Sequence, residues 1–452
     1  MGWISWLCPG IQLKRWLLLF TAGVIICAFS FALLFNNQVM AVVEEILFRM
    51  SYLTTGRYTN RLAIAASLAG IFVGIVVMVY ATRRIVRSVV GAISPESNGT
   101  LMETIFTQRK LSNGPAITVV GGGTGLSTLL RGMKYITGNC TAVVSAGDDG
   151  GSSGRLRQEM GIIPPGDLRS CLVAMADREP LMERVLQYRF EGDSALAGHN
   201  LGNLFLAAVA QTEGGMEEGL NAASQILKIR GHVIPSTLRN IQLRAEMTDG
   251  TFVLGESHIP EARKTIRKLH MLPADAPAAK SAVEAIAKAD ILIFGPGSLY
   301  TSVIPNLLVP GIREAVLASK AVKIYICNVM TQRGETDGYG AYDHVRALID
   351  HVGRPFLDYV IVNNQEVSPS LQALYLAKEQ VPVLPDIEKI ESLGMTVITA
   401  DLISKEDLVR HDPQKLARSI ISLVYRLRLF GRGFVFFDYL FMKQSMRKLK
   451  KV

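Results

Sequence analysis

The chain has 452 residues, of which 49% are hydrophobic and 19% are charged, and this composition excludes wholesale disorder. Its net charge of +9 is uneven: residues 1–110 carry +6 (10 basic, 4 acidic), residues 426–452 carry +7 (8 and 1), and residues 111–425 carry −4 (30 and 34). A nucleic-acid-binding protein is expected to carry basic charge on its folded body, so we expect no nucleic-acid partner. Five scattered cysteines without a C-x-x-C pair argue against a disulfide framework or a zinc ribbon.

Two uncharged apolar stretches near the N-terminus, Trp16–Phe35 and Leu62–Ala81, are candidate membrane spans. Each is long enough to cross a hydrocarbon core of about 30 Å as a helix. A cleaved signal peptide is the alternative for the first stretch, but no small-residue cleavage site follows it. A buried core helix is the alternative for the second.

Basic residues flank the two stretches and predict their orientation. They precede the first and follow the second: Lys14, Arg15, Arg83, Arg84 and Arg87. The positive-inside rule places these flanks in the cytoplasm and leaves residues 36–61 outside as a short loop. We therefore expect a membrane anchor over residues 1–81, with two spans in the inner (cell) membrane and both termini and the globular domain in the cytoplasm. Breaker pairs predict a linker over residues 82–115.

From residue 116 to 425, apolar strand patterns alternate with helical patterns. This order predicts an α/β fold, a Rossmann-like doubly wound parallel sheet. Two strand-like runs around Asp249-Gly250 predict a small antiparallel insertion. The predicted strands are Ile117–Val120, Ala142–Ser145, Ile291–Phe294, Lys323–Cys327, Tyr359–Val362 and Thr396–Thr399. The predicted helices are Leu126–Tyr135, Leu168–Ala176, Leu201–Ala210, Glu217–Leu227, Ser281–Ala289, Gly311–Ser319, Tyr342–His351 and Pro413–Arg426.

A glycine-rich loop follows the first predicted strand and precedes a helical pattern. Backbone without Cβ atoms can approach a ligand closely, and the N–H groups of a helix start attract anions. The loop therefore predicts a phosphate or nucleotide site, although a tight turn is the alternative. It departs from G-x-G-x-x-G because Leu126 occupies the last position. The candidate contacts are Gly121, Gly122, Gly123, Thr124 and Gly125.

A loop rich in acids, glycines and serines follows the second predicted strand. Asp148 and Asp149 are candidates to bind Mg²⁺ or to act as a base, whereas Ser152, Ser153 and Arg155 are candidates to bind phosphate. The alternative is a turn with solvated charges. We favour a site because the carboxyl ends of neighbouring parallel strands meet at one edge of the sheet.

Further polar segments stand at the start of helices predicted later in the chain. Asp167 precedes a helical pattern and is interpreted as its N-cap. His199 and Asn203 open another; His199 is a candidate ligand contact or general acid/base, a structural histidine is the alternative, and metal ligation by histidine is not expected. A second glycine loop and the end of the next strand complete the predicted crevice, with candidate contacts Gly297, Ser298, Tyr300, Asn328 and Thr331.

Five motifs in order resemble the CofD/YvcK-like family over about residues 116–415. They are VVGGGTGLSTLLRGMK, SAGDDGGSSGRLRQEMGIIPPGDLR, GHNLGNLFLA, GPGSLYTSVIPNLLVPGI and CNVMTQRGETDGY. The resemblance implies a Rossmann-like fold and one of two functions. One is 2-phospho-L-lactate transferase, which moves a phospholactyl group from a nucleotide diphosphate donor to a deazaflavin with Mg²⁺. The other, whose motifs look more similar, is the gluconeogenesis factor, a UDP-sugar-binding protein without established catalysis.

The gluconeogenesis-factor branch implies that Tyr375 and Arg410 bind the nucleotide sugar, and both residue types suit a base and a diphosphate. It also implies a link to cell-wall precursors, carbon metabolism and cell shape. We therefore expect a regulator that binds a ligand such as UDP-N-acetylglucosamine, with the transferase as the alternative and an NAD(P)-dependent oxidoreductase as the weakest one. Mg²⁺ is the one cofactor considered, and a homodimer is left open.

Residues 426–452 alternate aromatic and cationic side chains. The segment is too short and too charged to span a bilayer. It fits an interfacial segment on anionic lipid or, equally, an element docked on the body. The lipid bilayer is accordingly an expected partner.

Overall fold

The structure is a computed structural model that describes residues 13–34, 41–56, 61–93, 114–176, 179–404 and 410–427. The chain divides into two compact units, Met1–Gln108 (unit 1) and Arg109–Val452 (unit 2). Most of the predicted linker and nearly all of the basic aromatic tail lie outside the described residues.

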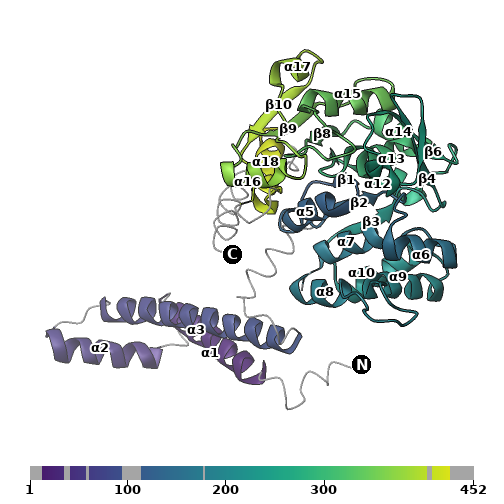
Figure 1. Ribbon diagram of the computed structural model, residues 1–452. Coiled ribbons are helices and arrows are strands. Elements are labelled where there is room, and N and C mark those ends of the chain that lie inside the picture. The colour runs from purple at the N-terminus through teal and green to yellow at the C-terminus, as the bar shows by residue number, and fades with distance from the viewer. Residues whose placement is uncertain are drawn as a thin grey trace. The chain divides into compact units, whose positions relative to one another are not determined.

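Unit 1 consists of helices α1 (Leu13–Leu34), α2 (Ala41–Thr55) and α3 (Arg61–Ile93) over its described residues (Figure 1). Two stretches, Arg15–Leu34 and Ile64–Ser88, are long and apolar enough to cross a membrane. They coincide with the two apolar stretches predicted as helices. Each of the two uninterrupted apolar stretches thus forms one long helix.

The residues between these helices differ from the predicted short loop, because they contain α2. Arg49 Nη2 lies 2.8 Å from Glu45 Oε1, an i,i+4 ion pair that favours a helix. The third helix is also longer than predicted and continues through the expected start of the linker to Ile93. The first proline after it is Pro95, so the chain lacks an earlier strong helix breaker.

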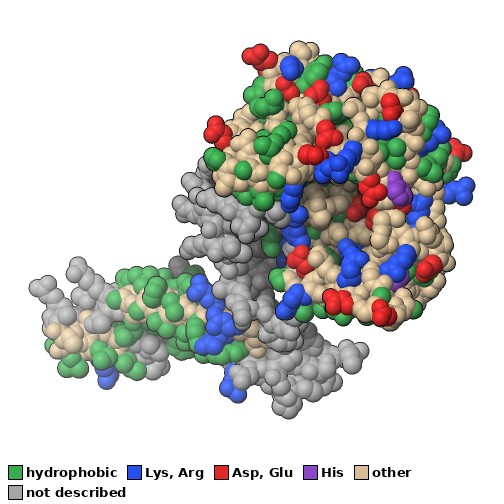
Figure 2. Space-filling view, viewed as in Figure 1, with side chains coloured by type: hydrophobic (Ala, Val, Ile, Leu, Met, Phe, Trp, Pro, Cys, Tyr) green, Lys and Arg blue, Asp and Glu red, His purple; other side chains and the backbone are tan. Residues whose placement is uncertain are grey.

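Helices α1 and α3 pack closely because glycines face the partner helix. A Cβ atom added at Gly23 would lie 2.8 Å from Met78 Cγ, and one added at Gly74 would collide with Cys27 Sγ. Small residues at such positions let two apolar helices approach each other. The outer surface of the pair is apolar (Figure 2) and exposes Leu17, Leu18, Val24, Ile25, Phe29, Phe31, Ile64, Leu68, Phe72 and Val73.

Unit 2 is built on a seven-stranded parallel sheet, as predicted, with the order β10-β9-β8-β7-β1-β2-β3. Strands β1 and β7 are buried at every position, which explains their continuous apolar sequences. The edge strand β3 was not predicted because His232 and Pro235 interrupt its apolar pattern. The strands are β1 Ile117–Gly121, β2 Cys140–Val144, β3 His232–Pro235, β7 Ile291–Phe294, β8 Val322–Ile326, β9 Tyr359–Asn363 and β10 Thr396–Ala400.

Helices flank the sheet and confirm the α/β architecture (Figure 1). Helix α5 packs against α7 and α18, whereas α12 packs against α14, and α13 against α15. All eight helices predicted from the sequence are present, within a few residues of their expected ends. The α-helices of unit 2, with one π-helical turn, are α5 Gly123–Met133, α6 Gly151–Met160, α7 Gly166–Met175, α8 Glu179–Leu186, α9 Leu201–Thr212, α10 Met216–Leu227, α11 His258–Glu261, α12 Lys280–Lys288, η3 Leu299–Val303, α13 Ile304–Leu308, α14 Pro310–Ala318, α15 Ala341–Val352, α16 Pro369–Leu376, α17 Ile387–Glu391 and α18 Pro413–Arg426.

The predicted antiparallel insertion is present with one strand more than expected. Strands β4 (Gln242–Met247) and β5 (Phe252–Leu254) form the hairpin around Asp249-Gly250. The third strand, β6 (Ile266–Leu272), pairs with the other edge of β4. Its buried residues, Ile266, Leu269 and Met271, do not alternate regularly with exposed ones, which explains why periodicity did not reveal it.

The strand order positions a ligand site. Strand β1 lies between β2 and β7, and the chain builds one half of the sheet on each side of it. The connections after β1 and β7 therefore leave in opposite directions, and a crevice opens between them at the carboxyl ends of the strands.

The tightness of packing in unit 2 can be tested at the contact between α5 and α18. A Cβ atom at Gly132 would collide with the Pro413 carbonyl oxygen and lie 2.8 Å from Ala417 Cβ. We expect Gly132→Ala to lower the free energy of unfolding by about 1–3 kcal/mol, the usual cost of overpacking. Urea unfolding followed by circular dichroism measures this, with Gln225→Ala on an exposed position of α10 as the control. A variant as stable as wild type would contradict the described packing.

Candidate functional site

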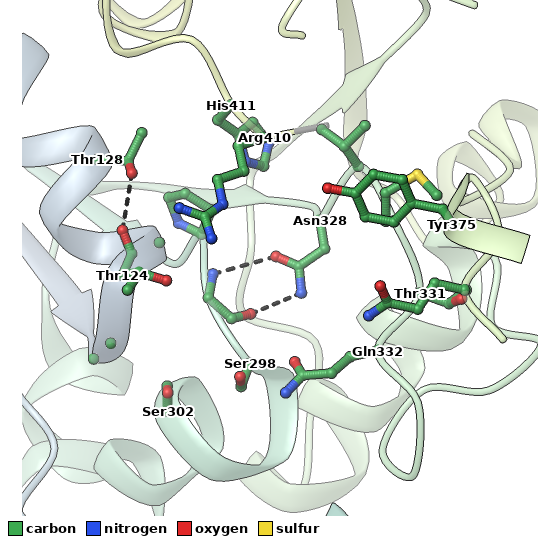
Figure 3. Close-up of a pocket in the computed structure, with 18 of the residues that line it drawn as sticks. Thr124, Thr128, Ser298, Ser302, Asn328, Thr331, Gln332, Tyr375, Arg410 and His411 are labelled. Carbon is green, nitrogen blue, oxygen red and sulfur yellow. Dashed lines mark hydrogen bonds between the residues drawn. The ribbon is translucent and has the colours of Figure 1, made fainter. Parts of the chain in front are cut away.

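A cavity of about 470 Å³ lies at the carboxyl ends of β1, β7 and β8 (Figure 3). Its walls come from the start of α5, the loops after β7 and β8, the end of α16 and the segment before α18. The described residues that line it are Gly122, Gly123, Thr124, Gly125, Thr128, Pro296, Gly297, Ser298, Ser302, Asn328, Val329, Met330, Thr331, Gln332, Tyr375, Lys378, Gln380, Arg410 and His411.

The first glycine loop forms the opening turn of α5, which begins three residues earlier than predicted, at Gly123. Gly123 has φ +66°, in the left-handed region that favours glycine. A Cβ atom at Gly125 would lie 2.6 Å from the Pro296 carbonyl oxygen, so only glycine allows the second glycine loop to approach. The first N–H groups of a helix have no intrahelical partner, and here they border the cavity, where an anion can accept their hydrogen bonds.

The second glycine loop is held in place by Asn328. Its Oδ1 accepts a hydrogen bond from Gly297 N at 3.2 Å, and its Nδ2 donates to Gly297 O at 2.8 Å (Figure 3). The amide therefore fixes the loop. Ser298 and Ser302 add hydroxyl groups to the same wall.

Tyr300 does not line the cavity, although the sequence predicted it as a ligand contact. It lies in η3, where its ring is buried and its hydroxyl oxygen lies 2.9 Å from that of Tyr339. Burial, with Tyr339 close by, raises the pKa of Tyr300 well above its usual range. The short π-helical turn directs this ring into the core and Ser302 toward the cavity.

Glu335 lies buried behind the wall that carries Gln332. It accepts hydrogen bonds from Gln332 Nε2 at 2.9 Å, Thr301 Oγ1 at 3.0 Å and Tyr300 N at 3.2 Å. Burial raises the pKa of this carboxyl to about 7, although the hydrogen bonds that it accepts lower the pKa in part. One carboxylate thus joins the loop after β8 to the loop after β7.

The far wall of the cavity combines an aromatic ring with two cations. Tyr375 is 8% exposed, and Lys378 Nζ lies 5.8 Å from the centroid of its ring. His411 is buried with Nε2 3.2 Å from Cys327 O, and burial lowers its pKa to about 4, so it is neutral at neutral pH. Lys378 and Arg410 are therefore the cations of the wall, and none of the described lining residues is acidic. Such a lining favours an anionic ligand.

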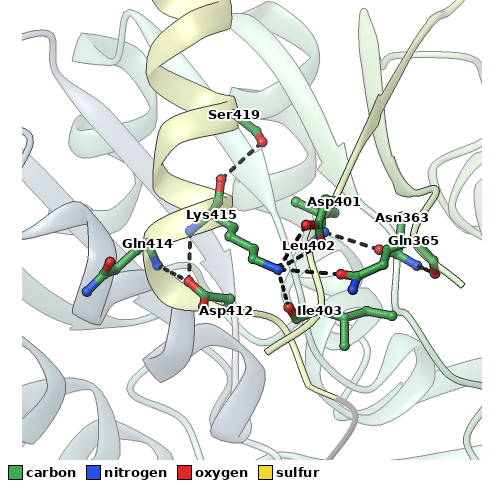
Figure 4. A network of polar contacts seen from close by, with 9 residues as sticks. All are labelled: Asn363, Gln365, Asp401, Leu402, Ile403, Asp412, Gln414, Lys415 and Ser419. Atoms are coloured by element: carbon green, nitrogen blue, oxygen red, sulfur yellow. Dashed lines mark hydrogen bonds and ion pairs between the residues drawn. The ribbon is translucent and has the colours of Figure 1, made fainter. Parts of the chain in front are cut away.

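The segment that carries Arg410 is anchored beside it (Figure 4). Lys415 Nζ lies 2.8 and 3.0 Å from the two carboxylate oxygens of Asp401, and it donates to Ile403 O at 2.7 Å. The Asp412 carboxylate accepts hydrogen bonds from Gln414 N and Lys415 N, both at 2.8 Å, and so caps α18. Although Arg410 is exposed, the backbone that follows it is fixed.

The loop rich in acids, glycines and serines is partly helical, because helix α6 begins at Gly151 and contains the serines. Ser152 Oγ lies 3.2 Å from His199 Nδ1 and accepts a hydrogen bond from Asn200 N at 3.1 Å. His199 and Ser152 are buried and connect α6 to the start of α9. Their contacts are those of structural residues, and neither lines the cavity.

The other predicted phosphate contacts of this region are also engaged with the protein. Asn203 Nδ2 donates to Ser153 Oγ at 3.3 Å, and Asn203 Oδ1 accepts from Arg169 Nη1 at 2.8 Å. Arg155 Nη2 donates to Ala197 O at 2.9 Å. These bonds hold α6, α7 and α9 together.

The acidic residues lie beside the first glycine loop. Asp149 accepts hydrogen bonds from Glu256 N and Ser257 N, both at 2.9 Å, and so fixes the turn before α11. Asp167 is the second residue of α7 and not its N-cap, which is Pro165. Its Oδ2 lies 2.6 Å from the position of a Cβ atom at Gly122. Asp167 therefore reaches the edge of the cavity from α7.

Burial and mutual repulsion raise the pKa values of these carboxyl groups. The pKa of Asp167 rises to about 6, through burial and the charge of Asp148. The pKa of Glu256 rises to about 8, through burial and the charges of Asp148, Glu335, Asp167 and Asp149. A bound cation would relieve the same repulsion. No group of three or more potential metal ligands occurs among the described residues.

The structure thus separates the predicted contacts into two sets. Those that line the cavity are Gly122, Gly123, Thr124, Gly125, Gly297, Ser298, Asn328, Thr331, Tyr375 and Arg410. Those that do not are Gly121, Asp148, Asp149, Ser152, Ser153, Arg155, His199, Asn203 and Tyr300. Sequence reasoning missed Ser302, Gln332 and Lys378; the last lies three residues after Tyr375, in the turn that follows α16.

Fold and cavity define a Rossmann-like α/β protein with a cavity lined by two cations at the switch point of its sheet. The family model "2-phospho-L-lactate transferase CofD" matches residues 117–403. The chain is 42% identical to a gluconeogenesis-factor relative of Nostoc sp. over 93% of this chain and 92% of the relative. It is 45% identical to the gluconeogenesis factor of Bacillus subtilis over 69% of this chain and 98% of that protein.

Among solved structures, a UPF0052 family protein from Bacillus halodurans is 47% identical, with a TM-score of 0.66 over 68% of this chain and 99% of that one. The chain belongs to the CofD family, and its relatives carry the name gluconeogenesis factor. The match to Nostoc covers more of this chain than unit 2 alone contains, so it extends into unit 1.

The raised pKa of Glu256 predicts how stability depends on pH. Folding raises this pKa from an ordinary 4.5 to about 8, so the folded protein keeps a proton that the unfolded chain releases. Stability therefore falls as pH rises between these values. We expect Glu256→Gln to reduce the loss between about pH 5 and about pH 8 by about 1–3 kcal/mol. Urea unfolding at both pH values measures it, with Glu261→Gln on α11 as the control; an unchanged loss would contradict the assignment.

Proposed function

We propose that the cavity binds a UDP-sugar such as UDP-N-acetylglucosamine, and that the protein is a non-catalytic regulator linked to cell-wall precursors, carbon metabolism and cell shape. The observation that carries this proposal is that one cavity joins the glycine loop at the start of α5 to Tyr375 and Arg410. The names of the relatives support a role in carbon metabolism.

The diphosphate of such a ligand fits the cavity where the two glycine loops meet. The first-turn N–H groups of α5 and the hydroxyls of Ser298 and Ser302 supply hydrogen bonds there. Lys378 and Arg410 supply positive charge from the opposite wall, and an arginine fork suits two phosphate oxygens.

The base of the ligand fits the wall formed by Tyr375. An aromatic ring stacks on a pyrimidine, and Lys378 lies near the same ring. The amides of Gln332 and Gln380 and the hydroxyl of Thr331 border this part of the cavity. These groups include both donors and acceptors, as the imide edge of uracil requires.

Arg410 provides the direct test. We expect Arg410→Ala to weaken UDP-N-acetylglucosamine binding about 10–100-fold, since hydrogen bonds to a charged group contribute about 1.5–3 kcal/mol. Isothermal titration calorimetry of the purified chain measures the change. Arg346→Ala, at an exposed position of α15, removes the same charge outside the cavity and should bind as wild type. Absence of any UDP-sugar binding by the wild-type chain would falsify the proposal.

We also propose that α1 and α3 span the cell membrane, with both termini and unit 2 in the cytoplasm. Two helices of sufficient length and apolarity support this placement. Their mutual packing through glycines and their exposed apolar side chains suit a lipid environment. The basic residues at the ends of α1 and α3 favour the cytoplasmic orientation.

A second candidate function is transfer of a phospholactyl group, which the description of the matching family names. The carboxyl groups of Asp148 and Asp167 beside the first glycine loop favour it. Mg²⁺ commonly uses one or two carboxylates together with phosphate oxygens, so these two residues fit the ion and would hold it. The ion would neutralise charge on the diphosphate of the donor, whose bond between the two phosphates breaks so that a nucleoside monophosphate leaves.

Turnover separates the two candidates. We expect the purified chain, given Mg²⁺, a nucleotide diphosphate phospholactyl donor and a deazaflavin acceptor, to form no transfer product, because both oxygens of the neighbouring Asp149 already accept hydrogen bonds from Glu256 N and Ser257 N. Chromatography of the deazaflavin measures this. A product that is lost in Asp148→Asn and retained in Glu159→Gln, at an exposed position of α6, would replace the regulator with the transferase.

A further inference from the structure

One end of the α1–α3 pair carries arginines without acidic partners on either helix. Neither helix contains an Asp or Glu residue. Arg15 is exposed near the start of α1, and Arg83 and Arg87 are exposed toward the end of α3. Figure 2 shows most of the basic side chains of this unit gathered toward one end of the apolar pair. These charges are therefore available to an anion from outside the two helices.

Arg84 is held between two aromatic rings at this end. Its Cζ lies 5.1 Å from the ring centroid of Trp16 and 5.4 Å from that of Tyr80. The two rings meet edge to face with their centroids 5.8 Å apart. Because Trp16 belongs to α1 and Tyr80 to α3, packing of the two helices builds the clamp. Cation–π contacts of this kind hold a guanidinium in one place.

The orientation of Arg84 leaves its phosphate-binding groups available. Nε donates to Tyr80 Oη at 3.2 Å, and no described residue accepts a hydrogen bond from either Nη. A guanidinium with free Nη groups can bind two oxygens of one phosphate. The geometry thus favours a phosphate over a single-point anion.

The position of this clamp identifies the source of the phosphate. Trp16 begins the first apolar stretch, and Tyr80 and Arg84 lie in the last third of the second. Trp and Tyr rings are enriched at the level of lipid headgroups. The exposed side chains of Leu17 and Leu18 follow Trp16 in the sequence and provide an apolar surface next to the clamp. A lipid can therefore occupy both the charged and the apolar part, which a free phosphate cannot.

We propose that Trp16, Tyr80 and Arg84 form a binding site for the headgroup phosphate of an anionic phospholipid, with Arg15 and Arg83 adding positive charge around it. The site rests on the proposed insertion of α1 and α3 into the membrane. Phosphatidylcholine carries its own positive charge next to the phosphate. The site therefore prefers phosphatidylglycerol.

Native mass spectrometry of the full chain, purified in detergent and given equal amounts of phosphatidylglycerol and phosphatidylcholine, tests the site. We expect Arg84→Gln to lower the preference for phosphatidylglycerol about fivefold, because each basic residue near an anionic surface contributes about 1 kcal/mol to binding. Trp16→Leu keeps every charge and removes the clamp, so it should also lower the preference. Arg49→Gln on α2, where Arg49 pairs with Glu45 at 2.8 Å, should leave it unchanged.

Equal losses in Arg84→Gln and Arg49→Gln, or an unchanged preference in Trp16→Leu, would indicate diffuse charge attraction and overturn the site. Displacement of the lipid by inorganic phosphate would overturn the choice of a lipid as ligand. Vesicle flotation examines insertion independently. If the chain floats with neither lipid, the membrane placement and the site are both wrong. If it floats with both lipids and shows no preference, only the site is wrong.

Discussion

The contact between the two glycine loops is the constraint on which the rest of unit 2 depends. Gly125 at the start of α5 lies against the backbone of Pro296 and Gly297, with no room for a Cβ atom. Adjacent parallel strands bring these loops together, and glycine allows the helix start to reach the sheet edge. This contact closes one side of the cavity, and the two hydrogen bonds of Asn328 fix the second glycine loop in place.

Charge is divided sharply around that contact. The cavity holds two cations and no acidic group among its described lining residues, whereas Asp148, Asp167 and Glu256 gather on the other side of the first glycine loop. The net charge of unit 2 therefore says little about its ligand. In the proposed function, local N–H groups, Lys378 and Arg410 select the ligand, and the neighbouring carboxyl groups are expected to make the region respond to protons and cations.

The sequence predicted the sheet, its main helices and the glycine loops, because continuous apolar strands and Gly-rich strand ends are local signals. It did not predict which polar side chains meet. Ser152, Ser153 and Asn203 are residue types that bind phosphate, but their hydrogen bonds join α6 to α9: Ser152 accepts from Asn200 N, and Asn203 donates to Ser153. Tyr300 lies in the core and not at the cavity wall, because a π-helical turn changes which side chains share a face. Tyr375 and Arg410 came from family resemblance, since neither lies in a motif with chemistry of its own.

Glu335 determines how the cavity can move. Its carboxylate accepts hydrogen bonds from Gln332 on one wall and from Thr301, next to Ser302, on another. These two walls are therefore expected to shift as one rigid body when a ligand enters. Two hydrogen bonds between Thr331 and Val381 tie the wall of Tyr375 to the same body. Opening is therefore left to the segment of Arg410, which Lys415 secures from one side. The dissociation rate of a ligand should accordingly follow the stiffness of that segment and depend little on the glycine loops.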